Sequence, residues 1–234
     1  MKKSSLITVA LASLVGLVGC NNGGASGPSK VSPEEFDTKM TELYESFIEK
    51  YAAGEAEFPE RAVLTYSWDQ VVTGDYIEPS VPSGVYKGTF SFHVAVDASY
   101  NWVVEPQPGE EWDAEDLAAA EEIIEDCYLN STMFAVIWNY AAYGYDLAQL
   151  LVGEGFDFEF YLNPISCKYS SSGEGTEQGV NYVYSLIESF VYDDLGFITG
   201  YVNHVEETDS GAQVGSINST ETYAISYIPS NAQQ

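Results

Sequence analysis

Basic residues are scarce in this chain. Lysine and arginine together number eight among 234 residues, against 36 aspartate and glutamate, and the formal net charge at pH 7 is −28. Nucleic-acid binding needs clustered cations that replace the counterions along the phosphates, whereas the few basic residues here are scattered. The composition therefore excludes nucleic acid as a partner. We interpret the acidic surplus as a means of staying soluble at an exposed surface, with specific cation binding as the alternative.

Histidine is rarer still, because His93 and His204 are the only two. The chain contains no His-Glu-x-x-His pair, no Gly-x-Ser-x-Gly nucleophile motif, no phosphate-binding glycine loop and no calcium loop. We therefore predict a protein that is not an enzyme and that uses no cofactor and no metal. Because carboxylates are abundant, a hydrolase with two acidic catalytic residues is kept as a third hypothesis.

No apolar run near the N-terminus is long enough to span a membrane. The stretch at residues 6–18 is shorter than the ~20 residues that a spanning helix needs. It follows Lys2 and Lys3 and leads to a small residue before Cys20, which is the pattern of an export signal. We therefore predict export rather than a transmembrane anchor.

Residues 17–20, with the sequence Leu-Val-Gly-Cys, resemble the lipobox of bacterial lipoproteins. The resemblance implies that the Cys20 sulfur is joined to diacylglycerol and that the chain is cut just before it. Two acyl chains suffice for stable attachment to a membrane. Residues 1–19 are then a lipoprotein signal peptide and residues 20–31 a lipidated flexible tether. We expect an extracytoplasmic protein, anchored through its lipid to the cell membrane or the outer membrane.

Two further cysteines, Cys127 and Cys167, are left once Cys20 carries lipid. An even pair in an exported chain is a candidate disulfide. Closing a loop of about 40 residues contributes ~4 kcal/mol in the chain-entropy model. Two separate buried thiols are the alternative, because many exporting bacteria use few disulfides. A nucleophilic cysteine is not expected, since neither cysteine lies in a redox motif.

The clearest local signal in the body of the chain is a helix start. Ser32, Pro33 and Glu35 supply a capping hydroxyl, a proline at the first helical position and the capping-box glutamate. Apolar residues then recur at helical spacing to about Gly54. Asp113 offers a similar cap to a second amphipathic helix. Its predicted apolar stripe consists of Leu117, Ala120, Ile124, Cys127 and Tyr128.

Strands are predicted where β-branched and aromatic residues alternate with polar ones. They cover residues 61–68, 85–96, 156–164, 180–192, 197–205 and 220–228. The glycines at 173–179 predict an exposed loop, and we favour a helix for 133–145, where periodicity alone does not decide. Together these elements predict a single α+β domain over residues 32–229, with a loose tail at 230–234. Its architecture is a curved antiparallel sheet with helices packed on one face.

Residues 33–228 resemble the half-barrel fold of lipoprotein-localisation carriers and related surface lipoproteins. The resemblance rests on the leading amphipathic helix, the hairpin turn Asp-Asp-Leu-Gly at 193–196 and the run Phe-Tyr-Leu-Asn-Pro at 160–164. It implies a curved sheet that wraps around helices and encloses an apolar groove. Because the carriers are usually soluble, the lipobox favours a tethered binding protein over a carrier.

Aromatic residues are the remaining functional signal, at 14% of the chain. Flat rings bury much area while keeping a polar edge, and they line many sites for lipids and sugars. The candidate groove residues are Trp68, Trp102, Trp112 and Trp138, with core filling as the alternative for each. The leading hypothesis is a lipid-anchored protein that binds a hydrophobic or amphipathic ligand. The main alternative is a structural or adhesive surface protein that recognises a glycan or a protein partner.

Overall fold

A single open antiparallel sheet organises the part of the chain that the computed structural model describes, residues 29–74, 82–99, 101–126, 157–212 and 214–229. The strand order is β1-β5-β6-β7-β8-β9-β2-β3-β4. The strands are β1 (Lys30–Val31), β2 (Arg61–Gly74), β3 (Gly84–Val96), β4 (Trp102–Val104), β5 (Asp157–Leu162), β6 (Ile165–Glu177), β7 (Val180–Tyr192), β8 (Ile198–Gly211) and β9 (Gly215–Tyr227). Two helices in the described residues accompany the sheet, α2 (Pro33–Ala52) and α3 (Ala114–Asp126). The predicted antiparallel α+β body is therefore confirmed at this coarse level.

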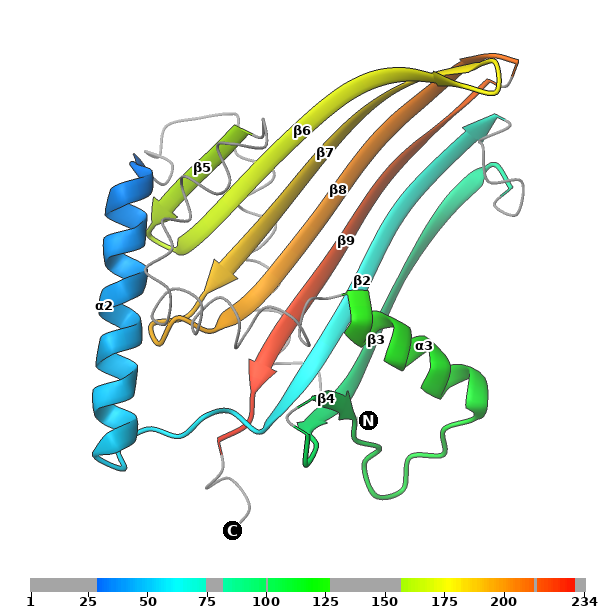
Figure 1. Ribbon diagram of the computed structural model, residues 1–234. Helices are drawn as coiled ribbons and strands as arrows, with labels where there is room; N and C mark the ends of the chain where they lie inside the picture. Colours follow the sequence, from blue (N-terminus) through cyan, green and yellow to red (C-terminus); the bar gives the residue numbers. More distant parts are fainter. Residues whose placement is uncertain (1–28, 75–81, 100, 127–156, 213, 230–234) are drawn as a thin grey trace, which may run out of the picture.

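Long neighbouring strands make up the centre of the sheet. Strands β6 to β9 follow one another as antiparallel neighbours, and β9 pairs with β2 along nearly its whole length. Figure 1 shows these strands side by side and bending along their length. Because successive residues of a strand point to opposite faces, the pairing register assigns every side chain to one face of the sheet.

Helix α2 begins as the sequence predicts. The Ser32 hydroxyl accepts a hydrogen bond from the Glu35 backbone N–H (3.2 Å), and the Glu35 carboxylate accepts one from the Ser32 N–H (2.9 Å). This reciprocal pair is a complete capping box, with Pro33 in the first turn. The side chains that α2 buries recur at helical spacing and are Phe36, Met40, Leu43 and Phe47.

Ser32→Ala is expected to lower the free energy of unfolding by about 1 kcal/mol, because the first turn of α2 loses the acceptor for a backbone N–H. Urea denaturation of the two proteins measures this difference. Ser29→Ala is the matched control, since Ser29 is exposed and precedes the cap. Equal stability of the two variants would contradict the capping role.

Helix α3 is capped by Asp113, as predicted. The Asp113 carboxylate accepts hydrogen bonds from the backbone N–H groups of Glu115 and Asp116, both at 2.9 Å. The predicted apolar stripe is only partly confirmed, because Ala120 is buried while Leu117 is 36% exposed. The cap thus sets where α3 begins. The side of α3 that is buried against the sheet is narrower than the predicted apolar stripe.

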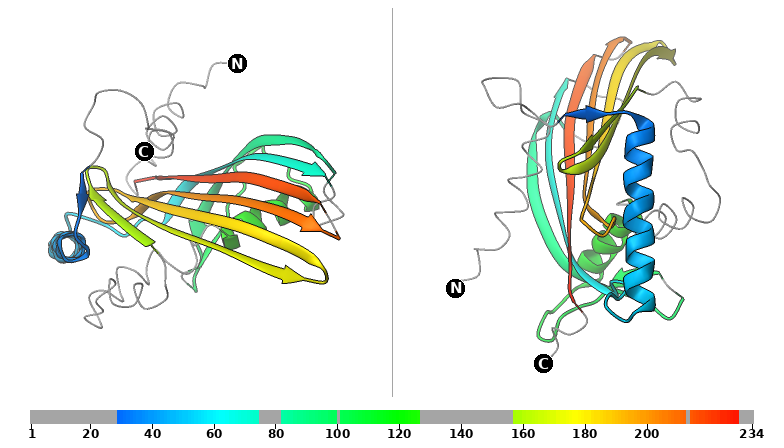
Figure 2. Two further views of the ribbon diagram at one scale, coloured as in Figure 1. Left: turned by 90° about the horizontal axis from the view of Figure 1, so that it is seen from above. Right: turned by 90° about the vertical axis from the view of Figure 1, so that its left-hand side faces the viewer.

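Both helices pack on the same face of the sheet. Phe47 of α2 and Ala120 and Ile124 of α3 belong to one buried core cluster. The sheet contributes to this cluster Ala62, Leu64, Phe92, Val94, Trp102, Ile198, Tyr201, Tyr223 and Ile225. The right-hand view of Figure 2 shows both helices on one side of the sheet. We call this side the helix face.

Residues 173–177 are part of a strand and not of a loop, which corrects the prediction, and only Gln178 and Gly179 form a turn. Strand β6 continues to Glu177 and pairs with β7 along this stretch. The physical reason is visible at two cross-strand pairs. A Cβ on Gly173 would lie 2.8 Å from the Tyr184 ring, and a Cβ on Gly175 would lie 2.3 Å from the Tyr182 hydroxyl. Tyrosine rings of β7 cover these glycines, so the glycines are strand residues that permit close approach.

Several element boundaries also differ from the predictions. Strands β2, β8 and β9 are longer than the predicted 61–68, 197–205 and 220–228. The sheet begins two residues before the predicted domain boundary, because Lys30 and Val31 pair with β5 although the predicted tether includes them. The turn at 193–196 is confirmed, with Gly196 at φ +88°.

Some predictions fall outside the described residues. They are the lipid site Cys20, the half-cystine Cys127, the candidate groove residue Trp138, the helix favoured for 133–145 and the tail at 230–234. Among the described residues, neither helix combines the length and the apolar character needed to cross a bilayer.

Candidate functional site

Two adjacent rows of side chains cross the helix face from β7 to β3. The aromatic row is formed by Phe190, Tyr201, Tyr223, Tyr66 and Phe90, each the register partner of the next. The polar row is two positions away on each strand, after the aromatic row in β8 and β2 and before it in β7, β9 and β3, and is formed by Glu188, Asn203, Glu221, Trp68 and Gly88. Because the side-chain period of a strand is two, both rows face the helices.

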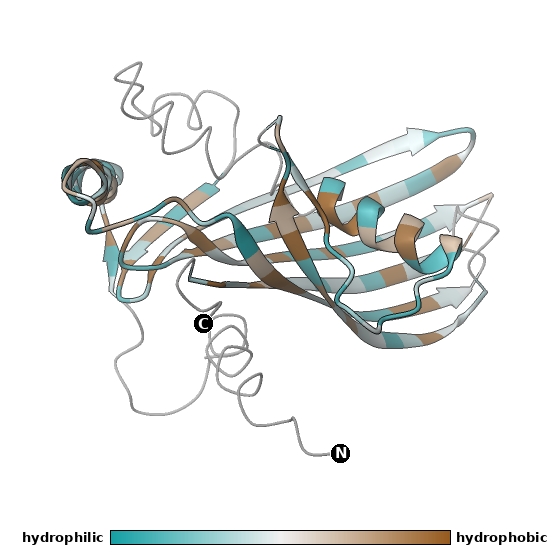
Figure 3. Ribbon diagram, turned by 90° about the horizontal axis from the view of Figure 1, so that it is seen from below, coloured by the Kyte–Doolittle hydropathy of each residue, from teal (hydrophilic) through white to brown (hydrophobic). Residues whose placement is uncertain are grey.

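A cavity of about 530 Å³ lies where these rows pass beneath α3. We call it the α3 groove. Its lining residues are Tyr66, Trp68, Thr89, Phe90, Asp116, Ala119, Glu122, Ile123, Glu221 and Tyr223. Figure 3 shows α3 lying across the strands, with hydrophobic and hydrophilic segments alternating along it. The groove therefore combines an aromatic floor with a wall of mixed polarity, which is typical of sites for amphipathic small molecules.

The aromatic floor of the α3 groove is held in place by stacking and by a glycine. The rings of Tyr66 and Trp68 stack with centroids 5.4 Å apart, and Tyr66 also lies 4.9 Å from Tyr223. Opposite Trp68 stands Gly88, where a Cβ would lie only 2.0 Å from the indole ring. The indole therefore rests directly on the backbone of β3, and any larger residue at 88 would displace it.

Glu221 is the best-oriented carboxylate of the groove. The Tyr66 hydroxyl donates a hydrogen bond to one of its oxygens at 2.8 Å, and the Asn203 amide reaches the other at 3.5 Å. Both donors are uncharged, so Glu221 is oriented by them without being neutralised. This leaves a fixed negative charge beside the rings of Tyr66 and Trp68.

A second carboxylate of the polar row, Glu188, lies beneath the surface. Its side chain is buried, and the Tyr201 hydroxyl donates a short hydrogen bond to it. Burial raises the pKa of Glu188 above its ordinary value, and the Tyr201 hydrogen bond opposes that shift. Glu188 does not line the groove, and its role is to fix Tyr201 within the aromatic row.

Glu188→Gln is expected to stabilise the fold at neutral pH. An acid whose folded-state pKa is raised contributes stability at low pH, and that contribution is lost as the pH rises through the folded pKa. The glutamine side chain carries no charge at any pH, so the stability advantage of the variant should grow as the pH rises above about 4, the ordinary pKa of glutamate. Urea denaturation at pH values from this pKa upward, with the exposed Glu121→Gln as control, measures the effect. Parallel pH profiles for wild type and Glu188→Gln would contradict it.

The predicted tryptophans have different positions. Trp68 lines the α3 groove. Trp102 is 2% exposed and packs in the core with Phe92, so the core-filling alternative is right for it. Trp112 packs against Phe90 and Phe92 with ring centroids 5.6 and 6.2 Å away, supporting the floor of the groove from outside its lining.

The sequence pattern did not single out the acidic residues of the site. A usable signal was present in the predicted strand 220–228, where Glu221 shares the period-two face of Tyr223 and Ile225. A carboxylate on an otherwise apolar strand face must find hydrogen-bond donors or a ligand. Periodicity could not show that α3 would lie above this point.

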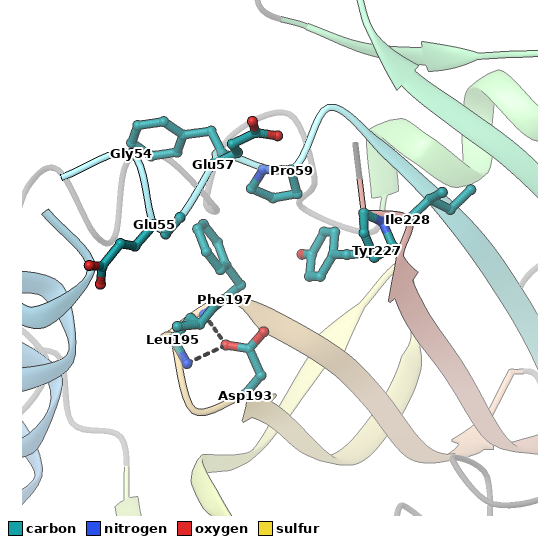
Figure 4. Close-up of a pocket in the computed structure, with 12 residues that line it drawn as sticks. Gly54, Glu55, Glu57, Pro59, Asp193, Leu195, Phe197, Tyr227 and Ile228 are labelled. Carbon is teal, nitrogen blue, oxygen red and sulfur yellow. Dashed lines mark hydrogen bonds between the residues drawn. The ribbon is translucent and has the colours of Figure 1, made fainter. Parts of the chain in front are cut away.

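A second cavity, of about 390 Å³, lies between the segment after α2, the β7–β8 turn and the end of β9. Figure 4 shows Phe197 and Tyr227 on one side of it and Asp193 below them. Asp193 accepts hydrogen bonds from the backbone N–H groups of Leu195 and Phe197, both at 2.9 Å. Its carboxylate thus closes the turn.

Burial raises the pKa of Asp193, while these backbone hydrogen bonds oppose the shift. The rings and carboxylates that line this cavity come from the segment after α2, the β7–β8 turn and the end of β9. They are not register partners on neighbouring strands, as the rings and the carboxylate on the sheet side of the α3 groove are. We therefore take the α3 groove as the candidate site and this second cavity as a gap between elements of the fold.

Cys167 is a buried free thiol in the structure. Burial raises its pKa to about 12, so the thiolate that reacts and binds metals is disfavoured. The Tyr192 hydroxyl lies 4.0 Å from its sulfur. Because Cys127 lies outside the described residues, the disulfide stays a prediction. The mass of the unreduced protein after alkylation in denaturant distinguishes a bridge from two thiols.

The described residues include no group of three histidine, cysteine or acidic side chains arranged to hold a metal ion. No family model, no curated protein and no solved structure matches this chain, so the chemistry of the α3 groove is the ground for assigning a function.

Proposed function

We propose that this protein is a lipid-anchored, extracytoplasmic binding protein that takes a hydrophobic or amphipathic small molecule in the α3 groove. The observation that carries the proposal is the groove itself: a cavity of about 530 Å³ between α3 and a floor formed by Tyr66, Trp68, Phe90 and Tyr223. Its size lies within the range of small-molecule sites in proteins, which is roughly 300–1,000 Å³. The proposed role is binding rather than catalysis.

The half-barrel resemblance supports the same role. In this proposal the bent sheet curves around α2 and α3 and forms one wall of the ligand site. The long strands of Figure 1 and the common core of both helices are consistent with such an arrangement. The rings that would meet the ligand come from β9, β2 and β3, and the backbones of β9 and β2 are paired on both sides.

Membrane attachment is proposed from the lipobox at residues 17–20. Cys20 would carry diacylglycerol, and the polar residues after it would let the folded body reorient above the membrane. Labelling of cells with radioactive palmitate should mark the wild-type protein and leave Cys20→Ala unmarked. An unlabelled wild-type protein, or a variant as firmly bound to envelopes as the wild type, would overturn the anchor.

Ligand binding is tested with Nile red, an uncharged dye whose fluorescence rises in apolar surroundings. The full chain carrying Cys20→Ser should bind the dye at one site and lose it when Ile123→Glu places a charge in the groove. Leu117→Glu on the exposed side of α3 is the matched control and should leave binding intact. Equal dye binding by both α3 variants would show that the groove is not the site.

A structural or adhesive role is the second candidate. The observation favouring it is the outer edge of β6, where residues 171–177 pair with β7 but with no other strand among the described residues. An unpaired edge can accept a strand from a partner. Glycan-array or partner binding by a protein that takes up no dye would favour this role over the first.

A further inference from the structure

We propose that the α3 groove selects an amphipathic organic cation, a molecule with an ammonium or guanidinium group joined to an apolar body. This inference rests on the proposed ligand-binding function and specifies the charge of the ligand. It follows from three features of the groove: the sign of its charge, the absence of a basic partner for that charge in the described residues, and the rings beside it.

The charged residues of the groove lining are all acidic. They are Asp116 and Glu122 on α3 and Glu221 on β9, and no lysine or arginine joins them in the lining. These carboxylates come from opposite walls of one cavity. Carboxylates that share a cavity raise the local negative potential, which favours a cation entering between them.

Five of the six lysines and arginines in the described residues have ion pairs elsewhere, and the sixth, Lys50, does not line the groove. Their ion pairs join Lys30 and Lys168 to Glu159, Lys39 to Glu42, Arg61 to Glu105 and Lys87 to Asp69. None of these pairs includes Asp116, Glu122 or Glu221. Among the described residues, the negative charge of the groove is therefore not compensated by a side-chain cation, and a ligand can supply the compensation.

The aromatic floor fits the same ligand. Tyr66 and Trp68 are stacked, and the Glu221 carboxylate is held beside them by the Tyr66 hydroxyl. A cation over the face of tryptophan or tyrosine is attracted by the ring quadrupole, and a nearby carboxylate adds to that attraction. Phe90 and Ile123 then offer apolar surface to the body of the ligand.

Hydrogen bonding around Glu221 also favours a ligand that donates hydrogen bonds. The Asn203 amide nitrogen points to Glu221, which leaves the Asn203 carbonyl oxygen buried and without a hydrogen-bond partner among the described residues. Flipping the amide would place two acceptors against each other, so this orientation is fixed by the carboxylate. The polar row around Glu221 is thus rich in acceptors, and an ammonium or guanidinium group supplies donors.

The test compares three probes with the same eight-carbon chain: octyltrimethylammonium, octyl glucoside and octanoate. Isothermal titration uses the full chain with Cys20→Ser at low and at high salt. We expect the cation to bind about tenfold more tightly than octanoate, with octyl glucoside between them. High salt should reduce the difference in affinity between octyltrimethylammonium and octanoate, because screening weakens the charge interaction.

Variants that remove one negative charge test whether the α3 groove causes the preference for the cation. Glu221→Gln, which keeps an acceptor for the Tyr66 hydroxyl, should weaken octyltrimethylammonium binding about fivefold and weaken octyl glucoside binding by a clearly smaller factor. Glu122→Gln should act in the same direction, whereas Glu121→Gln, outside the lining on the same helix, should not.

The outcomes separate the two proposals. Failure of all three probes to bind would overturn the proposed function together with the inference. Equal binding of the three probes, or tighter binding of octanoate, would overturn the cation preference and leave the ligand site standing. A cation preference that survives both Glu221→Gln and Glu122→Gln would show that the overall acidity of the chain causes it, and would equally overturn the assignment to this groove.

Discussion

Gly88→Ala is expected to weaken binding of Nile red and of octyltrimethylammonium in the α3 groove by about tenfold or more. A Cβ at this position would lie 2.0 Å from Cζ2 of Trp68, far inside any van der Waals contact. The indole must then leave its place on β3, and the groove loses the central part of its floor. We expect overpacking of this kind to lower the free energy of unfolding by about 1–3 kcal/mol as well.

Gly84→Ala is the matched control, because Gly84 lies on the same strand and faces the same side four residues away. Its Cβ would lie 3.3 Å from the ring of Tyr86, a contact that a shift of a few tenths of an ångström relieves, and Tyr86 does not line the groove. Dye titration and the near-ultraviolet circular dichroism of the tryptophans follow both variants. If Gly88→Ala binds as tightly as Gly84→Ala, the floor of the site lies elsewhere.

Phe47→Ala is expected to lower the free energy of unfolding by about 3–5 kcal/mol, the largest effect on stability that we predict. Phe47 is 1% exposed and makes edge-on contacts with Phe58 and Phe197, at centroid distances of 4.8 and 5.1 Å. It is the fully buried α2 member of the main core cluster, against which Tyr44 and Ile48 of the same helix pack partly buried. Removing its ring leaves a cavity that these aromatic neighbours cannot close.

Tyr51→Ala provides the comparison within the same helix. Tyr51 stacks on Phe47 at 6.2 Å but is 49% exposed, so its removal should cost under about 1 kcal/mol. Urea denaturation at one pH measures both variants. Equal losses would mean that α2 does not dock through the inward side of its apolar stripe.

Local signals allowed a good part of the fold to be predicted. The capping box at Ser32, the cap at Asp113 and the turn ending in Gly196 depend on residues a few positions apart, and each is present as predicted. Strand β7 was also placed correctly at 180–192, because its aromatic and β-branched residues recur between glycine-containing turns.

The wrong predictions share a cause, which is that partners distant in sequence determine the structure. A loop was predicted at Gly173 and Gly175 because nothing near them in the sequence shows that tyrosines of β7 would lie over them. Trp102 and Trp68 are equally aromatic in the sequence, yet one is in the core and the other lines the groove. Whether a tryptophan lies in the core or lines the groove depends on where α3 packs on the sheet. That packing joins residues that are distant in the sequence.

The sequence allowed the type of site to be predicted, but not its acidic residues. The abundance of rings indicated an aromatic groove, and Trp68 was among its proposed residues. The contribution of Glu221 requires the register that pairs β9 with β2, because only this register places Glu221 opposite Trp68. The carboxylates of α3 reach the same cavity through helical spacing, with Asp116, Ala119 and Ile123 on one side of the helix.

The ligand site between α3 and the sheet is tested most directly by the indole signals of the 15N-labelled full chain carrying Cys20→Ser. During titration with octyltrimethylammonium, the Trp68 indole resonance, assigned with Trp68→Phe, should shift in a saturable way. The Trp102 resonance should stay in place, because Trp102 is 2% exposed in the core. A Trp68 resonance that does not move, or a Trp102 resonance that moves as far, would contradict a ligand site in the α3 groove.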